Sequence, residues 1–269
     1  MDKEHQPIHA VHELGPDTYR IEEAGIGNAY LLLGKTKGLL IDAGIGLGTI
    51  AKVISKLTEL PVDVTLTSFL PHHSGGRFAF PSCLIHEASN TTKYLRENQR
   101  PACLSSAWFE FRAKGEFAKP VYRKPQIIPI DDNTVFDLGE RLIRVMLVPG
   151  RTKSSVIFVD EGHHLAFVGE TLGKEVHLDD WDSVSVEEWL SSAETLLALT
   201  EKLEMHSFDG ETFQKEQVEE LIAIAKRIVD GAPYVKLAFG RGAYPCLPDE
   251  SPYRFVFKRK AIKKEKRRN

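Results

Sequence analysis

The sequence predicts an α/β protein, a four-layer α/β/β/α sandwich in which two sheets lie face to face and helices cover their outer sides. The chain has 269 residues, of which 42% are hydrophobic and 27% charged, so it is long enough to bury a full core. Apolar and β-branched runs typical of strands occur in two groups along the chain. One helical pattern interrupts the first group and two helical patterns follow the second, which is the order expected of such a sandwich.

The first group contains five expected strands and one expected helix. A helix over residues 49–58 is predicted because Ile50, Val53, Ile54 and Leu57 recur at helical spacing. Each strand is a short run of apolar or β-branched residues bounded by turns, and the five runs are residues 18–23, 28–33, 39–42, 62–67 and 83–86. Residues 89–119 are expected to be helical and irregular.

The second group contains five expected strands and is followed by two helices. The strands are predicted at residues 126–130, 134–136, 142–148, 155–160 and 165–168. The helices are predicted at residues 186–203 and 214–230, because each has an apolar stripe. Ser185 and Glu188 have the spacing of a capping box at the start of the first helix. No low-complexity linker interrupts the chain, so residues 1–257 are predicted to form a single domain.

The charges are distributed unevenly. Residues 258–269 contain eight Lys or Arg and one Glu, whereas the formal net charge of the whole chain is −3. The rest of the chain is therefore acidic, which argues against a nucleic-acid-binding surface and leaves residues 258–269 as a solvated basic tail.

Two further features of the sequence concern the environment of the protein. The polar N-terminus and the lack of a long apolar run predict no signal peptide and no membrane partner. Three cysteines without close spacing, Cys83, Cys103 and Cys246, predict neither a disulfide framework nor a thiolate metal cluster. A cytoplasmic location is the expectation.

Residues with useful chemistry gather at the ends of the expected strands. The first such segment is Ile41-Asp42-Ala43-Gly44, and the second is Thr67-Ser68-Phe69-Leu70-Pro71-His72-His73-Ser74-Gly75-Gly76. The third is Pro149-Gly150-Arg151-Thr152, and the fourth is Gly169-Glu170-Thr171. Loops that follow strands often carry function, so these four segments are the candidate site.

With these four segments in this order, residues 15–257 resemble the metallo-β-lactamase superfamily. The family pattern reads Asp-x-Gly, Thr-His-x-His-x-Asp-His-x-Gly-Gly, Pro-Gly-His-Thr and Gly-Asp-Thr, followed by a loop with the last histidine ligand. In this chain the comparable loop is His206–Glu211. The resemblance implies a sandwich of metallo-β-lactamase type, a site at the strand ends and a small-molecule substrate.

The ligands of the family's first metal site are replaced in this chain. The resemblance places Ser68, Leu70 and Arg151 at the positions of its three histidines. Leucine has no donor atom, and arginine is a permanent cation that does not bind metal ions. The first metal site is therefore predicted to be lost.

The second metal site retains potential ligands. The resemblance assigns it to His72, His73, Glu170 and Asp209, with His206 or Glu211 as alternatives to Asp209. Two imidazoles and one or two carboxylates can hold one zinc, iron or manganese ion. The favoured alternative is a site without metal, in which Arg151 faces Glu170 and its guanidinium replaces the missing cation.

The favoured function is an enzyme that acts on a small ester, lactone, thioester or enolisable carbonyl compound by metal-independent acid/base chemistry, as a lyase, isomerase or hydrolase. Arg151 is expected to bind a carboxylate or an oxyanion, His72 or His73 to transfer a proton, and Glu170 to fix Arg151 or the imidazole. Candidate substrate-binding residues are Ser68, Trp181 and His206. Two alternatives stay open, namely a mononuclear metal-dependent hydrolase and a catalytically inactive binding protein. The sequence makes no prediction of oligomeric state.

Overall fold

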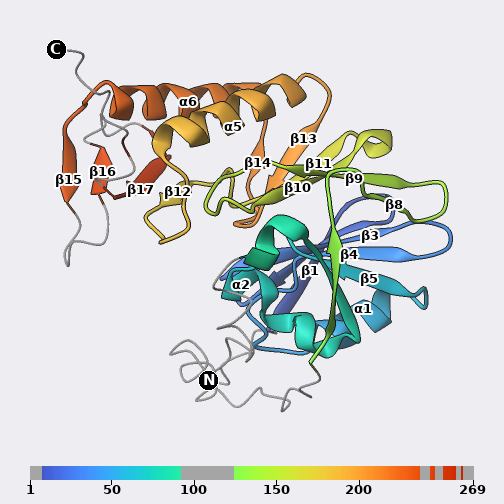
Figure 1. Ribbon diagram of the computed structural model, residues 1–269. Helices are drawn as coiled ribbons and strands as arrows, with labels where there is room; N and C mark the ends of the chain where they lie inside the picture. The colour runs from blue at the N-terminus through green and yellow to red at the C-terminus, as the bar shows by residue number, and fades with distance from the viewer. Residues whose placement is uncertain (1–7, 92–123, 237–242, 246–250, 259–261, 263–269) are drawn as a thin grey trace, which may run out of the picture. The chain divides into compact units, whose positions relative to one another are not determined.

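The computed structural model describes residues 8–91, 124–236, 243–245, 251–258 and 262 (Figure 1). The chain divides into two compact units, of which the first comprises residues 1–146 and 158–162 and the second residues 147–157 and 163–269. The predicted single domain over residues 1–257 stays a prediction. Most of the expected irregular helical segment 89–119 and of the basic tail lies outside the described residues.

A mixed seven-stranded sheet forms the centre of the first unit, with strands in the order β1-β2-β3-β4-β5-β6-β7. Strands β1 to β4 pair antiparallel, and β4 to β7 pair parallel. The five strands predicted in the first group are confirmed, together with the strand predicted at 126–130. Strand β1 was not predicted. The strands are β1 (His9–Gly15), β2 (Thr18–Glu23), β3 (Gly27–Leu33), β4 (Gly38–Ile41), β5 (Val62–Thr65), β6 (Ser82–His86) and β7 (Gln126–Ile130).

Helix α1 (Ile50–Leu57) confirms the helix predicted at residues 49–58. It buries Ile50 and Ile54, which belong to the same apolar cluster as Leu31 of β3 and Leu40 of β4. Strands β3 and β4 are buried along their whole length, which explains why apolar residues follow one another without alternation from Ala29 to Leu33 and from Leu39 to Ile41.

A carboxylate anchors the loop between β4 and α1. The side chain of Glu23 accepts hydrogen bonds from the backbone amides of Ile45 at 2.6 Å, Gly46 at 3.2 Å, Leu47 at 2.7 Å and Gly48 at 3.3 Å. Glu23 is only 3% exposed, so the amides replace the water that this carboxylate would otherwise bind. The loop that begins with Asp42 is thereby fixed.

The histidine segment, which follows β5, forms a short helix, α2 (Pro71–Ser74). A 3₁₀ turn over Gly75–Ala79 follows it directly. A Cβ atom on Gly75 would lie 1.9 Å from the carbonyl oxygen of Ile45, and one on Gly76 would lie 2.1 Å from that of Ala43. Both positions therefore require glycine, because the histidine segment packs on the backbone of the loop after β4.

The strands predicted in the second group are also confirmed. They are β8 (Val135–Asp137), β9 (Leu142–Leu147), β10 (Val156–Asp160) and β11 (Leu165–Gly169). In the first unit, β8 pairs antiparallel with β9. Buried Arg141, between these two strands, donates from Nε to Oδ2 of Asp160 at 2.7 Å and from Nη1 to the carbonyl oxygen of Asp17 at 2.8 Å. Short 3₁₀ turns occur at Glu87–Thr91 and Glu161–His163.

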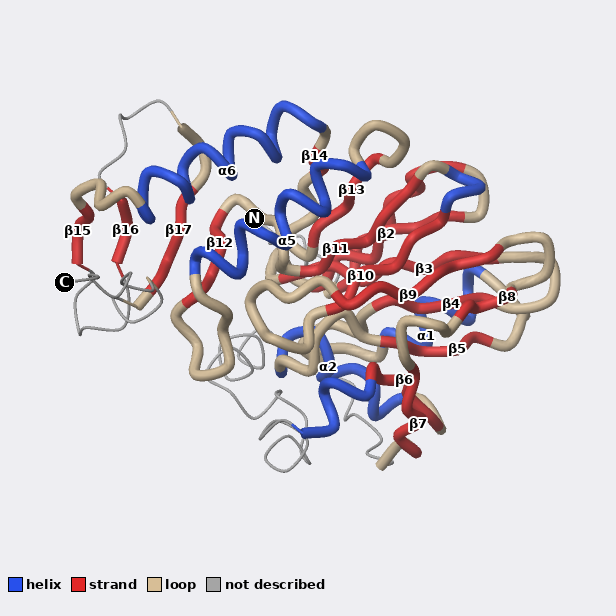
Figure 2. Tube along the Cα trace, turned by 45° about the horizontal axis from the view of Figure 1, so that its top comes forward, coloured by secondary structure: helices blue, strands red, loops and turns tan. Residues whose placement is uncertain are grey.

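The second unit contains strands and two long helices, α5 (Val186–Leu199) and α6 (Lys215–Val229), which pack side by side (Figure 1 and Figure 2). The predicted capping box is confirmed, since Ser185 Oγ accepts from Glu188 N at 3.2 Å and Glu188 Oε2 accepts from Ser185 N at 2.9 Å. The remaining strands are β12 (Glu175–Leu178), β13 (Glu204–Ser207), β14 (Thr212–Phe213), β15 (Tyr234–Lys236), β16 (Ala243–Pro245) and β17 (Arg254–Phe257).

His206 was expected in a loop, and this expectation is wrong. The residue lies on β13, which pairs parallel with β11 and antiparallel with β14. Its ring stacks on Phe167 of β11, with 5.8 Å between the centroids, and its Nε2 lies 3.1 Å from Oε1 of Glu204. Strand pairing on both sides buries His206 to 4% exposure.

Candidate active site

A buried network joins Asp42, which follows β4, to His73 of α2. Oδ2 of Asp42 lies 2.8 Å from Nδ1 of His73 and accepts a hydrogen bond from Thr67 Oγ1 at 2.7 Å. Oδ1 accepts from the backbone amide of Thr67 at 2.8 Å, so Asp42 also binds the loop after β5. The side chains of Asp42 and His73 are 1% and 0% exposed. The contact to His73 was not predicted.

This network sets the tautomer of His73. The carboxylate of Asp42 can only accept, so the proton of a neutral His73 ring lies on Nδ1 and the lone pair lies on Nε2. His72 is adjacent, partly exposed and tilted by 47° relative to His73, with 4.7 Å between the ring centroids. The structure thus orients one imidazole firmly and places a second beside it.

Ser68 and Leu70 are buried, at 4% and 3% exposure. Ser68 Oγ accepts a long hydrogen bond of 3.4 Å from the backbone amide of Leu70. Within the described chain no histidine is hydrogen-bonded to Ser68, so the arrangement lacks the base that a serine nucleophile needs. The substrate-binding role of Ser68 stays a prediction.

In the second unit, Arg151 is clamped by two carboxylates. Its Nη1 donates to Oε1 of Glu170 at 2.5 Å, and its Nε donates to Oδ2 of Asp180 at 2.8 Å. Burial alone would lower the pKa of Arg151, but the two carboxylates outweigh it and raise the pKa above its ordinary value. The pairing of Arg151 with Glu170 is the one anticipated from the sequence, whereas Asp180 was not anticipated.

The loop between β12 and α5 holds Arg151 in place. Ser183 Oγ donates to the carbonyl oxygen of Arg151 at 2.8 Å, and the amide of Lys153 donates to the carbonyl oxygen of Asp182 at 3.1 Å. On the other side, a Cβ on Gly150 would lie 2.7 Å from Oγ1 of Thr171, so this glycine permits the close approach of the two segments. The guanidinium is therefore fixed through both its side chain and its backbone.

The third nitrogen of the guanidinium, Nη2, makes no hydrogen bond to any residue of the described chain. The Arg151 side chain is 18% exposed, so the group is partly shielded from water. A planar guanidinium with two nitrogens already committed presents the remaining N–H bonds in one fixed direction. This geometry suits an anionic or carbonyl oxygen.

The other predicted residues of the second unit have different environments. Oδ2 of Asp209 accepts from the amide of Lys174 at 2.8 Å, and Oδ1 accepts from the hydroxyl of Ser207. Asp209 therefore stabilises its own loop. The side chain of Trp181 is 53% exposed, and its role in substrate binding stays a prediction.

The comparisons with known proteins agree with this architecture. A family model for the metallo-beta-lactamase superfamily matches residues 76–203. A metallo-beta-lactamase family protein from Thermus thermophilus superposes with a TM-score of 0.60 over 81% of this chain and 82% of that chain, at 21% identity. The chain has the metallo-β-lactamase fold. The predicted fold class and the predicted resemblance to the metallo-β-lactamase superfamily are therefore confirmed.

Further relatives share this metallo-β-lactamase fold or part of the sequence. A metallo-beta-lactamase from Pontibacter korlensis gives a TM-score of 0.59 at 13% identity and covers 81% of this chain and 99% of that one. Acyl-coenzyme A thioesterase MBLAC2 from Gallus gallus is 23% identical over 198 residues, which are 67% of this chain and 70% of that protein. The Homo sapiens protein of the same name is 23% identical over 204 residues, with 67% and 71% coverage. In the described part of the chain, no helix has the length and apolar character needed to cross a membrane.

The residues that the resemblance places at the first metal site do not have the donors of a dinuclear centre. At the three histidine positions of the first site, Leu70 has no donor, Ser68 serves its own turn, and Arg151 is a cation held by two carboxylates. The positively charged guanidinium of Arg151 has no lone pair to offer a metal ion and would repel it, so it cannot replace a histidine ligand. The predicted ligands of the second site, His72, His73 and Glu170, keep the chemical groups for one ion, although Oε1 of Glu170 already accepts from Arg151.

Proposed function

We propose that the chain is a hydrolase that cleaves a thioester, or a comparably activated ester, of a small organic molecule by acid/base chemistry without a metal ion. The observation that carries the proposal is the clamped guanidinium of Arg151 in the Pro-Gly-Arg-Thr segment, where the family pattern has a metal-binding histidine. The substrate class is supported by the thioesterase name of the MBLAC2 relatives.

His73 is the proposed general base. With its Nδ1 proton held by Asp42, the Nε2 lone pair can take a proton from water as the water attacks the carbonyl carbon. Asp42 then stabilises the imidazolium that forms, in the manner of a catalytic triad. The proton passes to the sulfur or oxygen of the leaving group as the carbon–sulfur or carbon–oxygen bond breaks.

Arg151 is the proposed electrostatic stabiliser. Its Nη2 hydrogens are directed at the carbonyl oxygen, where negative charge develops in the tetrahedral intermediate. Glu170 and Asp180 prevent the guanidinium from reorganising during the reaction, because each fixes one of the other two nitrogens. A thioester suits such a site better than an amide, since thiolates leave readily without metal-bound hydroxide.

The test starts with protein purified without chelator, analysed for zinc, iron and manganese, and assayed on a panel of acyl thioesters. We expect substoichiometric metal and hydrolysis that chelator does not abolish. Arg151→Lys should lower kcat about 100-fold or more, because lysine keeps the charge but loses the fork geometry. Arg144→Ala, which removes a surface arginine, should leave kcat unchanged. Binding without turnover of any substrate would instead indicate an inactive binding protein.

A mononuclear hydrolase is the second candidate, and one observation favours it. An imidazole whose Nδ1 is held by a carboxylate, as His73 is by Asp42, is also the usual arrangement of a metal-ligating histidine. In that case His72, His73 and Glu170 are the candidate ligands, and the ion would supply Lewis-acid chemistry. A stoichiometric ion that is lost together with activity on chelation, and restores activity on readdition, would decide for this candidate.

A further inference from the structure

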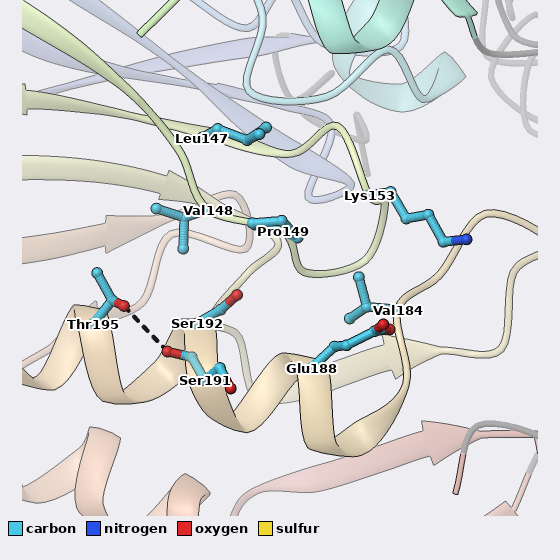
Figure 3. A pocket seen from close by; sticks show the side chains of 9 residues that line it. All are labelled: Leu147, Val148, Pro149, Lys153, Val184, Glu188, Ser191, Ser192 and Thr195. Carbon is cyan, nitrogen blue, oxygen red and sulfur yellow. Dashed lines mark hydrogen bonds between the residues drawn. The ribbon is translucent and has the colours of Figure 1, made fainter. Parts of the chain in front are cut away.

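A cavity of about 410 Å³ lies in the second unit (Figure 3). One wall comes from the end of β9 and the residues after it, and the other from helix α5. The candidate catalytic residues His72, His73, Arg151 and Glu170 are absent from its lining. Neither the sequence pattern nor the site described above assigns a role to this cavity.

The surface of the cavity is mainly apolar. Leu147, Val148, Pro149 and Val184 present carbon atoms to it. Two hydroxyl groups of the helix wall already have partners, since Thr195 Oγ1 donates to the carbonyl oxygen of Ser191 at 3.1 Å and Ser191 Oγ donates to that of Glu187 at 3.5 Å. These hydroxyls do not require a polar ligand, so the cavity suits a hydrocarbon chain.

One cation is available at the cavity. Lys153 contributes to the lining and makes no salt bridge with any residue of the described chain, although its charge acts on the carboxylate of Asp182. The carboxylate of Glu188, which also contributes, is turned to the start of its helix, where it accepts from Ser185 N at 2.9 Å. An apolar cavity with one ammonium group in its lining is complementary to an aliphatic chain that ends in an anion.

The cavity and the clamped guanidinium share one short loop. Pro149 and Lys153 flank Arg151 in the segment closed by the hydrogen bond from Val148 N to the carbonyl oxygen of Ser155, at 3.0 Å. A ligand in the cavity therefore contacts the loop that carries Arg151. This connection links the cavity to the proposed reaction.

We propose that the cavity binds an aliphatic carboxylate, the acid that is released when an acyl thioester is hydrolysed, with its chain among the apolar side chains and its carboxylate paired with Lys153. The proposal rests on the proposed function only in naming the acid as the reaction product. Water adds an OH group to the acyl carbon, the thiol leaves with a proton, and the acid loses its proton to solvent. The substrates would then be thioesters of aliphatic acids.

The test is calorimetric binding of butanoate, hexanoate and octanoate to the full chain, with hexanol as the neutral probe. Each added methylene should tighten binding about fourfold, from about 0.8 kcal/mol per buried methylene. Leu147→Trp and Val184→Trp should each weaken octanoate binding about tenfold or more by filling the cavity. Lys153→Met should reduce hexanoate to the affinity of hexanol. Lys226→Met, on the exposed face of α6, is the matched control and should change nothing.

Two results would overturn the proposal: affinity that does not depend on chain length, or tight octanoate binding in both tryptophan variants, with circular dichroism showing that they are folded. If hexanol bound as tightly as hexanoate, the proposed pairing of the carboxylate with Lys153 would be wrong. The outcome is separable from the proposed function. Carboxylate binding without thioester hydrolysis would contradict the reaction alone, and thioester hydrolysis without chain-length-dependent carboxylate binding would contradict the cavity alone.

Discussion

Nη1 of Arg151 lies 2.5 Å from Oε1 of Glu170, and the two side chains are only 18% and 19% exposed. Asp180 shares the same cation through Nε at 2.8 Å. Two partly buried carboxylates thus pair with one guanidinium, which makes the cation more important for folding than a surface arginine.

Arg151→Ala should lower the free energy of unfolding by about 2 to 3 kcal/mol, because it leaves Glu170 and Asp180 uncompensated. Urea denaturation followed by circular dichroism measures the change. The triple variant with Glu170→Gln and Asp180→Asn should recover most of the loss, since the unpaired charges are removed together with the cation.

Arg144→Ala is the matched control for this prediction. Arg144 pairs with Glu161 at the same distance, 2.5 Å, but these side chains are 45% and 68% exposed. Solvent screens such a pair, so we expect a loss below about 1 kcal/mol. Equal losses for the two arginines would show that burial of the Arg151 cluster has no energetic effect.

Asp42→Asn should reduce kcat for thioester hydrolysis about 100-fold or more with little change in KM. The amide of asparagine cannot hold the Nδ1 proton of His73 as a carboxylate does, so the imidazole loses its productive tautomer. Steady-state kinetics measures the effect. Asp131→Asn, in a surface turn with Thr134, should leave kcat unchanged. Full activity of Asp42→Asn would rule out His73 as an oriented base.

Glu23→Gln should destabilise the protein by about 2 kcal/mol or more. The carboxylate accepts from the amides of residues 45–48, and the NH₂ group of glutamine would turn a donor toward those donors. Chemical denaturation measures the loss, with Glu22→Gln on the more exposed neighbouring residue as the control. A loss no larger than that of the control would show that water can replace these contacts.

Cys83 should be inert to thiol reagents in the folded protein. Burial raises the pKa of its thiol to about 12 despite the nearby Arg77 cation, so the reactive thiolate is scarce near neutral pH. In a variant with Cys103→Ser and Cys246→Ser, Ellman's reagent at pH 8 should label Cys83 only after denaturant is added. Rapid labelling of the native protein would contradict this burial.

The same thiol gives a pH dependence with a definite sign. Its unfolded-state pKa is 9.0 and its folded-state pKa is about 12. The unfolded chain therefore loses this proton first, and the contribution of Cys83 to stability is complete below pH 9 and declines as the pH rises toward 12. Cys83→Ala should abolish this part of the alkaline decline in urea denaturation curves.

Local features of the chain were predicted well from the sequence. The capping box of α5 depends on Ser185 and Glu188, which are three residues apart in the sequence. Because the contact is local, their spacing in the sequence is enough to predict it. Strands such as β3 and β10 were predictable because their buried residues form continuous apolar runs. The pairing of Arg151 with Glu170 followed from the family pattern rather than from periodicity.

Distant partners could not be predicted in this way. Asp180 lies 29 positions after Arg151 in an irregular loop that also contains Asp179 and Asp182. The sequence does not indicate which of these three aspartates pairs with Arg151. Glu23 is bound by backbone amides, which every residue has, so no side-chain pattern reveals its role. His206 was misplaced because β13 has four residues, too few to show alternation.

The glycine contacts after α2 have a practical consequence for protein engineering. The backbone at Gly75 and Gly76 runs so close to the carbonyl oxygens of Ile45 and Ala43 that no side chain fits there, and the amide of Gly75 donates to the carbonyl oxygen of Gly44 at 2.8 Å, so backbone packing holds the histidine segment in shape. Ser68 and Leu70 can therefore be replaced one at a time on a backbone that should not move. Any reactivity gained by installing histidines there would report on side-chain chemistry alone.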